Sequence, residues 1–334
     1  MKVILLISNN QTSPFIHKDQ TPVALIKFGG KYLLEHLLNE LLLLTEEDLQ
    51  DIIFVTSSEM GIYHDALKQI ATKFNLKTSV FTCYNGNSTL DALACASEVL
   101  KGPVLIMPSN AWFKGGSTIK AHGENLVLVS KVDDPSEHSV VKLEMNNAIS
   151  AFYENSNEYI SDLSPVGGYF FKDAETIISD IQDLLSEKQT EENLLDLTQL
   201  IEQRIQKGDR FLPSILEGWN RCENIDDVIK THRMIIAGFT THRDIGDTSE
   251  IKNTVIISPV FIGENAKISN SVIGPYVSIG DGAFIENAIL NDTLLAENTH
   301  VENVKLSDSM LGHHAIYEGK NKRVNLGNHT YIKE

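Results

Sequence analysis

A short repeated motif in the last third of the sequence restricts what the chain can fold into. From Ile256 to Ile289 an aliphatic residue returns every five or six positions, with small or turn-forming residues between. Several such units in register predict one short strand per unit, its aliphatic side chain pointing inward, and three strands close one triangular coil. The pattern indicates a left-handed parallel β-helix of hexapeptide repeats. With roughly ten units up to Ile316 we expect about three coils, near the minimum that repeat stacking tolerates.

The rest of the chain has a different pattern. Residues 1–240 alternate short β-branched runs with longer amphipathic runs. This alternation predicts an α/β domain with a Rossmann-like, mixed but mostly parallel sheet. Strands are expected at 3–7, 51–55, 103–107, 126–132, 139–143 and 166–171, and helices at 32–44, 64–74, 89–100 and within 173–207. The sequence therefore predicts two domains, an α/β domain over 1–240 and a β-helix domain over 250–334.

The charge balance excludes some partners. Lys and Arg number 28 against 45 Asp and Glu, which gives a formal net charge of −17. Such a surface repels phosphate backbones and anionic lipids, so we expect neither nucleic acid nor a membrane surface as partner. The apolar start of the chain ends at Ser8, far short of the ~20 residues of a membrane helix. We expect no membrane span and no signal peptide.

The cysteines bear on the compartment. Cys83, Cys95 and Cys222 are odd in number and lack the spacing of a metal site. They suit a reducing compartment better than a disulfide framework. We therefore expect inert thiols in or near the core, and a cytoplasmic protein.

Motifs along nearly the whole chain resemble those of one family. They are TPVAL and GKYLL (21–25 and 30–34), TLDAL (89–93), KVDDP (131–135), GGYFF (167–171), Trp219 and VNLGNHT (324–330). They are similar to motifs of the sugar-1-phosphate nucleotidyltransferases, especially the long-form glucose-1-phosphate thymidylyltransferases. The resemblance implies attack of a sugar-1-phosphate on the α-phosphate of a nucleoside triphosphate, with pyrophosphate leaving. That reaction needs cradled phosphates, a divalent ion and cations near the developing charge.

The positions that would carry this chemistry depart from the family pattern. The glycine-rich phosphate loop reads Ser8, Asn9 and Asn10, and the lysine that follows it is Val23. The two metal aspartates are replaced by Asn110, which follows Ser109, and by Arg221. In the sugar-phosphate motif Glu154 is kept but Asn155 stands in place of lysine. An amide brings no negative charge to Mg²⁺, and a guanidinium opposes it.

We interpret the chain as a degenerate family member, a non-catalytic nucleotide-binding or nucleotide-sugar-binding or regulatory protein without a metal or cofactor. In this hypothesis Arg221 meets a phosphate directly, and the competing hypothesis is a site that has drifted shut. The alternative is an active transferase that needs Mg²⁺, with Asp91, Glu154 or another carboxylate replacing the lost ligands. The candidate pocket residues are Ser8, Asn9, Asn10, Thr89, Asp91, Ser109, Asn110, Glu154, Gly167 and Arg221. Because the uncapped faces and ends of a solenoid tend to associate with other protein surfaces, we expect a homo-oligomer or pairing with an active family member.

Histidines in and after the repeat suggest a second class of function. His300, His313, His314 and His329 lie where acetyltransferases with this solenoid use a histidine base. Few coils leave little wall for a coenzyme A groove, and His313 and His314 fit polar turn positions. We therefore rank acyl transfer below both interpretations of the nucleotidyltransferase.

Overall fold

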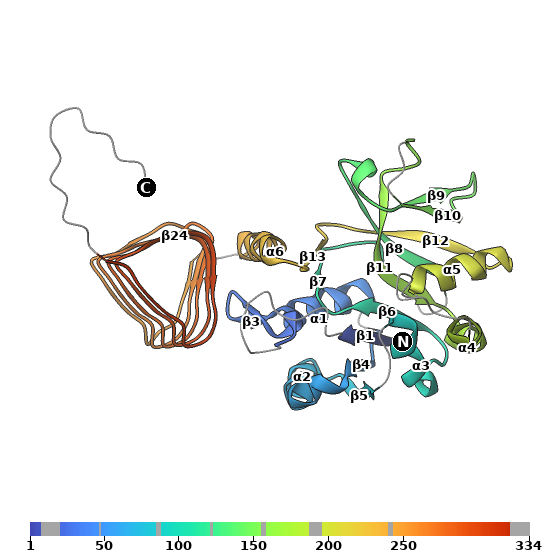
Figure 1. The fold of residues 1–334 in the computed structure, drawn as a ribbon, viewed down its shortest axis with the longest axis horizontal. Coiled ribbons are helices and arrows are strands. Elements are labelled where there is room, and N and C mark those ends of the chain that lie inside the picture. The colour runs from blue at the N-terminus through green and yellow to red at the C-terminus, as the bar shows by residue number, and fades with distance from the viewer. Residues whose placement is uncertain are drawn as a thin grey trace. The chain divides into compact units, whose positions relative to one another are not determined.

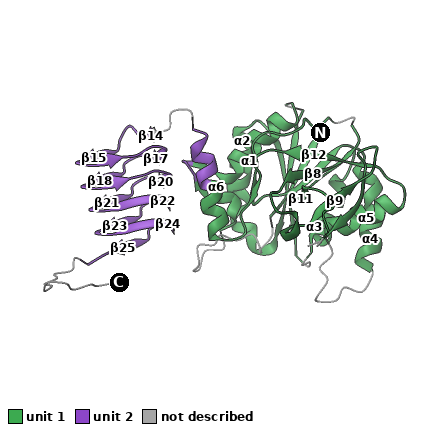
Figure 2. Cartoon of the chain, turned by 90° about the horizontal axis from the view of Figure 1, so that it is seen from above, with its two compact units in different colours: residues 1–27, 31–231 green, residues 28–30, 232–334 purple. Residues whose placement is uncertain are grey.

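The computed structural model describes residues 1–7, 21–46, 48–84, 88–120, 123–154, 158–186, 196–239 and 243–320. The chain divides into two compact units (Figure 2). The first unit consists of residues 1–27 and 31–231, and the second of residues 28–30 and 232–334. The second unit therefore includes a three-residue segment from near the N-terminus.

The first unit is built on a seven-stranded sheet in the order β12-β8-β11-β6-β1-β4-β5 (Figure 1). Its strands are β1 (Lys2–Ile7), β4 (Asp51–Ser57), β5 (Lys77–Cys83), β6 (Val104–Pro108), β8 (Asn125–Lys131), β11 (Leu163–Phe171) and β12 (Phe211–Leu216). β11 runs antiparallel to β6 and β8, whereas the other neighbours are parallel. The predicted Rossmann-like, mostly parallel sheet is confirmed.

Helices cover both faces of this sheet, which explains why β1 is apolar at nearly every position. Val3 and Leu5 belong to one hydrophobic core, whereas Ile4 and Leu6 belong to a second core. A strand buried on both faces has no polar side. The helices are α1 (Leu33–Leu44) and α2 (His64–Lys73) in the first core, and α3 (Thr89–Cys95), α4 (Ile178–Ser186) and α5 (Leu197–Gln206) in the second. Of the helices described, none is long and apolar enough to cross a membrane.

Short elements complete the first unit. β9 (Val140–Leu143) pairs with β10 (Ile149–Tyr153), and β2 (Lys27–Phe28) with β3 (Lys31–Tyr32). β7 (Ala111–Trp112) pairs with β13 (Asn220–Arg221). A last helix, α6 (Ile225–Ala237), begins in the first unit and ends in the second.

Two of the cysteines differ from the prediction. Cys83, at the end of β5, and Cys95, at the end of α3, form a disulfide across a Cα separation of 5.6 Å. The prediction of three free thiols is wrong for this pair, because α3 packs on β5 and brings the two ends together. Cys222 is a buried free thiol, as predicted.

The second unit is the predicted left-handed parallel β-helix of hexapeptide repeats, and Figure 1 looks along its stacked triangular coils. One wall consists of β15 (Glu250–Lys252), β18 (Lys267–Ser269), β21 (Phe284–Glu286), β23 (His300–Glu302) and β25 (Ile316–Glu318). The other strands are β14 (Arg243–Ile245), β16 (Val255–Ile256), β17 (Val260–Ile262), β19 (Val272–Ile273), β20 (Val277–Ile279), β22 (Ile289–Leu295) and β24 (Lys305–Leu311). Inward aliphatic side chains such as Ile268 and Ile285 form its core.

The solenoid has more coils than predicted. Five strands stack in the β15 to β25 wall, so the expectation of about three coils is wrong. Equivalent positions along this wall are Glu250, Lys267, Phe284, His300 and Ile316, which makes each coil 16 or 17 residues long. The coils are shorter than three full hexapeptides, and the pairing starts already at β14.

Asparagines form one corner of the solenoid. Asn253, Asn270, Asn287 and Asn303 all have positive φ, between 49° and 56°. Asparagine tolerates this left-handed conformation because its short side chain bonds locally. The Nδ2 atom of Asn253 donates to Oδ1 of Asn270 at 2.7 Å. His314 has a φ of 57° at another corner, as expected of a turn residue.

The turn 28–30 and the end of α6 pack on the solenoid within the second unit. The Gly29 amide donates to Oγ of Ser278 at 3.1 Å. Arg233 donates from Nε to Asp292 at 2.6 Å, and Asp308 lies 3.3 Å from its Nη2. Beside it, His232 is only 1% exposed, with its ring 6.2 Å from that of Phe28.

Candidate ligand site at the end of β6

Two of the predicted positions meet at the carboxyl end of β6, the end of a strand where open α/β sheets bind ligands. β6 is followed by Ser109 and Asn110, and Arg221 of β13 lies opposite Ala111 of β7. The Cys222 amide donates to the Asn110 carbonyl at 2.8 Å, which extends the pairing by one residue. The structure therefore makes neighbours of the two positions that resemble the metal aspartates.

Asn110 is held in place by the backbone. Its side chain is buried, and Nδ2 donates to the Cys222 carbonyl at 3.2 Å. Its Oδ1 is shielded from solvent and has no hydrogen-bond partner in the described part of the chain. Ser109, also buried, donates its amide to the Leu6 carbonyl at 3.1 Å. The Asn110 amide oxygen is thus a buried acceptor whose partner is missing, which is costly in a folded protein.

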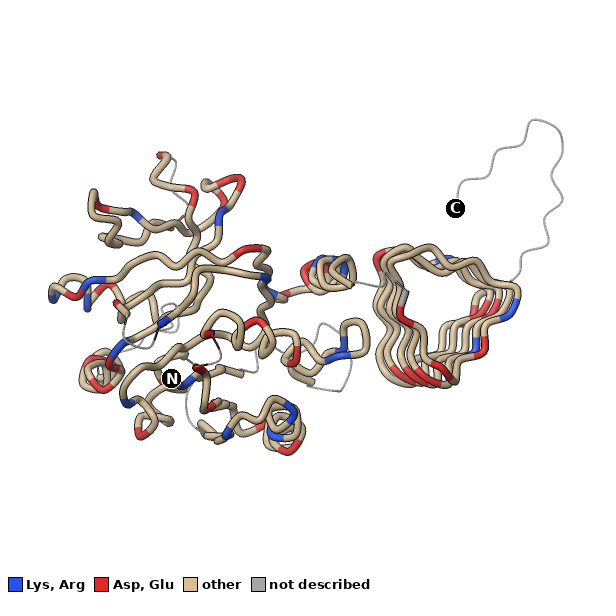
Figure 3. The backbone as a smooth tube through the Cα atoms, turned by 180° about the vertical axis from the view of Figure 1, so that it is seen from behind, with Lys and Arg blue, Asp and Glu red and all other residues tan. Residues whose placement is uncertain are grey.

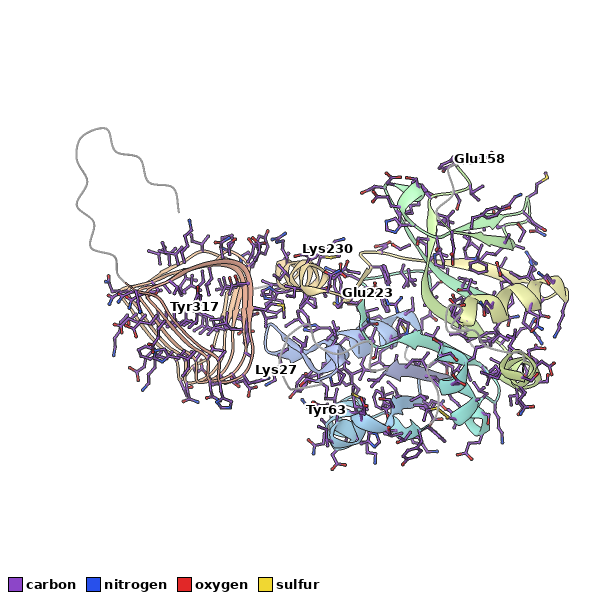
Figure 4. All side chains as sticks on the ribbon, viewed as in Figure 1. Lys27, Tyr63, Glu158, Glu223, Lys230 and Tyr317 are labelled. Atoms are coloured by element: carbon purple, nitrogen blue, oxygen red, sulfur yellow. A yellow bond between two sulfur atoms is a disulfide. The ribbon has the colours of Figure 1, made fainter. Side chains whose placement is uncertain are left out.

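Arg221 remains accessible. Its side chain is 40% exposed, and Nε lies 3.1 Å from the Glu223 carboxylate, which is 59% exposed. Figure 4 marks Glu223, which follows β13 and which sequence reasoning missed although it stands two positions after Arg221. An exposed pair of this kind contributes about 0–1 kcal/mol. The guanidinium is therefore free to exchange Glu223 for a stronger anion.

β11 contributes the third side of the site. Gly167 has a φ of 80°, and a Cβ there would lie 3.6 Å from Cδ of Pro108. The buried Tyr169 hydroxyl is 3.2 Å from Oγ1 of Thr198. Burial raises the pKa of Tyr169 to about 12, although the Thr198 hydrogen bond and the Arg221 charge act in the opposite direction. The phenol is neutral at physiological pH, and Gly167 leaves the end of β6 uncovered by a side chain.

Other predicted positions have structural roles. Val23 is 1% exposed in a short turn, so its side chain packs in the protein interior and does not face a ligand. Asp91 accepts hydrogen bonds from the Ser88 amide at 3.0 Å and the Ser88 hydroxyl at 2.7 Å. Ser88 in turn accepts from the Asp91 amide, so the pair caps α3, in which Thr89 is the first residue. Sequence reasoning missed Ser88, although serine three residues before an acid is a capping signal.

Glu154 lies apart from this cap, exposed after β10. Partial burial raises the pKa of Glu202 in α5, and the charges of Asp196 and Glu154 add to this rise. Glu154 therefore belongs to an acidic group with α5. Ser8, Asn9, Asn10, Asn155, His329 and the segment 324–330 lie outside the described residues.

The residues at the end of β6 do not fit the divalent ion that the family chemistry implies. Asn110 offers a neutral amide and Arg221 a positive charge, whereas Mg²⁺ is held by carboxylates. In the described ranges only one group of His, Cys, Asp and Glu side chains converges closely enough to hold a metal ion, and it lies in the β-helix.

Comparisons with known proteins identify the family. Residues 18–252 match the nucleotidyl transferase family, and residues 226–314 match a GlmU-like C-terminal hexapeptide family. The chain belongs to the nucleotidyl transferase family, and its second unit is of the GlmU-like hexapeptide type. Both assignments confirm the resemblance seen in the sequence.

Two curated relatives are each named bifunctional protein GlmU. The one from Methanococcus vannielii is 25% identical over 244 residues, covering 71% of this chain and 55% of the relative. The one from Methanococcus maripaludis is 24% identical over 261 residues, covering 77% and 59%. The chain thus spans somewhat more than half the length of these relatives.

Solved structures show the same fold. A putative glucose-1-phosphate thymidylyltransferase from Bacillus anthracis has a TM-score of 0.56 at 18% identity, covering 70% of this chain and 94% of its own. A nucleoside-diphosphate-sugar pyrophosphorylase from Vibrio cholerae RC9 has a TM-score of 0.58 at 15% identity, covering 70% and 100%.

Proposed function

We propose that this protein is a nucleotidyltransferase homologue that binds a nucleotide or nucleotide sugar at the end of β6 and does not transfer a nucleotidyl group. The observation that carries the proposal is Arg221, an accessible guanidinium on β13 at the end of β6, one position along the pairing from the buried Asn110. Both occupy positions where the family resemblance implies metal carboxylates.

The charges at this place favour an anionic ligand. A guanidinium presents a planar set of donors that matches phosphate, and it supplies the positive charge that a metal ion otherwise brings. A phosphate that Arg221 can bind is the chemical group that nucleotides and nucleotide sugars share.

The competing functions have less support. An active transferase needs carboxylates to replace the lost metal ligands, but Asp91 caps α3 and Glu154 lies among the carboxylates near α5. Acyl transfer needs a histidine that acts as a base. His314 instead occupies a corner of the solenoid, where its positive φ is typical of a turn residue. A cytoplasmic location, and self-association or pairing with an active relative, belong to the proposal and stay predictions.

The test combines calorimetric binding with a turnover assay on the full chain. Five nucleoside triphosphates and the common nucleoside-diphosphate sugars are titrated in EDTA, and pyrophosphate release is followed with Mg²⁺ and sugar-1-phosphates. We expect binding that survives EDTA, weakens about tenfold or more in Arg221→Gln, and yields no pyrophosphate. Arg210→Gln is the matched control, because Arg210 is exposed and donates a hydrogen bond to the Asn146 carbonyl, a backbone group.

The other results are equally decisive. Pyrophosphate release that a chelator abolishes means an active enzyme with rebuilt metal ligands. Absence of binding across the panel means that the site has closed. Equal weakening in both arginine variants means that net charge, and not the Arg221 position, carries the binding.

A further inference from the structure

Three side chains of metal-ligating types converge on the outer surface of the β-helix. The His300 cluster consists of His300 and Glu302 on β23 and Glu318 on β25, and their ligand atoms lie within 4.8 Å of one another. His300 Nε2 is 3.6 Å from Glu302 Oε2 and 3.7 Å from Glu318 Oε1. Tyr317, which is labelled in Figure 4, precedes Glu318 on β25.

The imidazole is held by stacking and lacks a hydrogen bond at the atom that faces the carboxylates. Its ring stacks on Phe284 of the preceding coil, with centroids 4.7 Å apart and an interplanar angle of 19°. Nε2 is shielded from solvent and has no hydrogen-bond partner in the described residues. The ring therefore points an unsatisfied nitrogen toward two oxygens that lie too far away to accept a hydrogen bond.

The carboxylates stack in a ladder. Glu286, Glu302 and Glu318 are in register on β21, β23 and β25, and Figure 3 shows acidic residues in columns along the solenoid. Like charges directly opposite on neighbouring strands destabilise a sheet. Asn303 Nδ2 donates to Oε1 of Glu302 at 2.9 Å, which holds that carboxylate while its Oε2 faces His300. Hydrogen bonds that orient a ligand in this way are common around bound metals.

The separations fit ligands that share one ion. Two atoms about 2.1 Å from a tetrahedral ion lie about 3.4 Å apart. The observed 3.6 Å and 3.7 Å are close to this value and longer than a direct hydrogen bond. We propose that the His300 cluster binds a divalent transition-metal ion of the Zn²⁺ class, with water as further ligand. One imidazole and two carboxylates suit such ions, and Glu318 is exposed enough (62%) to leave room for water.

The ion ties the last two strands of the wall together. It neutralises adjacent carboxylates of the ladder and joins β23 to β25, the final strand described. Its role is structural, because ligands from two successive coils fix their separation. Metal binding that requires the folded arrangement adds its free energy to folding.

The test uses the full chain with any affinity tag removed, stripped with EDTA and titrated with ZnCl₂ in a calorimeter. We expect one Zn²⁺ per chain, with affinity lowered at least about tenfold in His300→Ala and in Glu302→Gln. His313→Ala is the matched control, since His313 is an exposed histidine outside the cluster. Co²⁺ gives a second measurement through visible absorption bands, expected in the parent and lost in His300→Ala.

Hydrogen exchange separates loss of the site from loss of the fold. Zn²⁺ is expected to slow exchange in β25 of the parent and of His313→Ala, but not of His300→Ala. The proposal is overturned if the parent takes up no Zn²⁺, or if the His300 and Glu302 variants bind as tightly as the His313 control. Circular dichroism confirms that the surface variants are folded.

Discussion

Asn110 and Cys222 are joined by two hydrogen bonds, one from the Cys222 amide to the Asn110 carbonyl at 2.8 Å and one from Asn110 Nδ2 to the Cys222 carbonyl at 3.2 Å. The side chain that replaces a metal aspartate of the resembled family therefore has a structural role. It fastens β13 to the end of β6 and so sets where Arg221 lies. An aspartate could not make the second bond, because a carboxylate has no donor.

Restoring the family residue is expected to weaken the protein. Asn110→Asp leaves the Cys222 carbonyl without its donor and buries a charge, so it should lower the free energy of unfolding by about 2–3 kcal/mol. Both tryptophans lie in the first unit, so urea unfolding followed by their fluorescence measures this change. The exposed Asn75→Asp should shift stability by less than about 0.5 kcal/mol. An Asn110→Asp protein as stable as its parent would show that the amide bond does not matter.

Stability is expected to fall with pH because of His232. Burial lowers the pKa of His232 to about 3, and the neighbouring Arg233 charge adds to the effect. The unfolded state, with an ordinary pKa near 6.5, binds more protons between these values, so stability is lost as pH drops below about 6.5. At pH 5 this single group lowers the free energy of unfolding by about 2 kcal/mol relative to neutral pH.

The substitution His232→Phe separates the pH dependence of stability due to His232 from that of other groups that also destabilise the protein at low pH. His64, whose pKa is lowered mainly by burial, acts in the same direction. His232→Phe removes one titrating group, so melting temperatures measured from pH 7.5 to 4.5 should vary less than in the parent. The exposed His138→Gln should leave the slope unchanged. A His232→Phe slope equal to that of the parent contradicts the assignment.

The stability of the first unit is expected to depend on the buried Asp180 carboxylate. It is 4% exposed and accepts from Arg204 Nη1 at 2.9 Å and from Lys207 Nζ. Burial by itself would raise the pKa of Asp180. The hydrogen bonds and charges of Lys207 and Arg204 outweigh this effect, so the pKa is lowered overall and the carboxylate is charged. Asp180→Asn should cost about 2–3 kcal/mol, because it removes the buried charge that Arg204 and Lys207 share, although Arg204 keeps its pair with Asp209. Asp183→Asn on the same helix is exposed and should be neutral in the same denaturation experiment.

Gly274 is expected to tolerate no side chain. Its φ is 104°, and a Cβ would lie 1.8 Å from the Ile257 carbonyl oxygen of the preceding coil. Gly274→Ala should therefore lower the stability of the solenoid by more than about 3 kcal/mol, seen as faster hydrogen exchange in β17 and β20. Gly61→Ala is the control, since nothing lies within 4 Å of a Cβ there. Unchanged hydrogen exchange in Gly274→Ala would mean that the two neighbouring coils can move apart to make room for the methyl group at little cost in free energy.

Local patterns in the sequence determined the two kinds of architecture. Alternate burial of Val3 and Ile4 on opposite faces, and the return of Ile268 and Ile285 to one core, follow from strand geometry and burial alone. The capping of α3 by Ser88 and Asp91 is equally local. Such features depend on neighbours within a few residues, so the order of residue types predicts them.

Tertiary structure alone decided the pairings between distant residues. The sequence offers Asn110 and Arg221 as separate departures, but only the β7–β13 register places them together. The Cys83–Cys95 bond and the meeting of His300 with Glu318 depend in the same way on how α3 packs on β5 and on the length of a coil. Residues that are remote in sequence meet only when packing and strand register are settled, and these are properties of the whole fold.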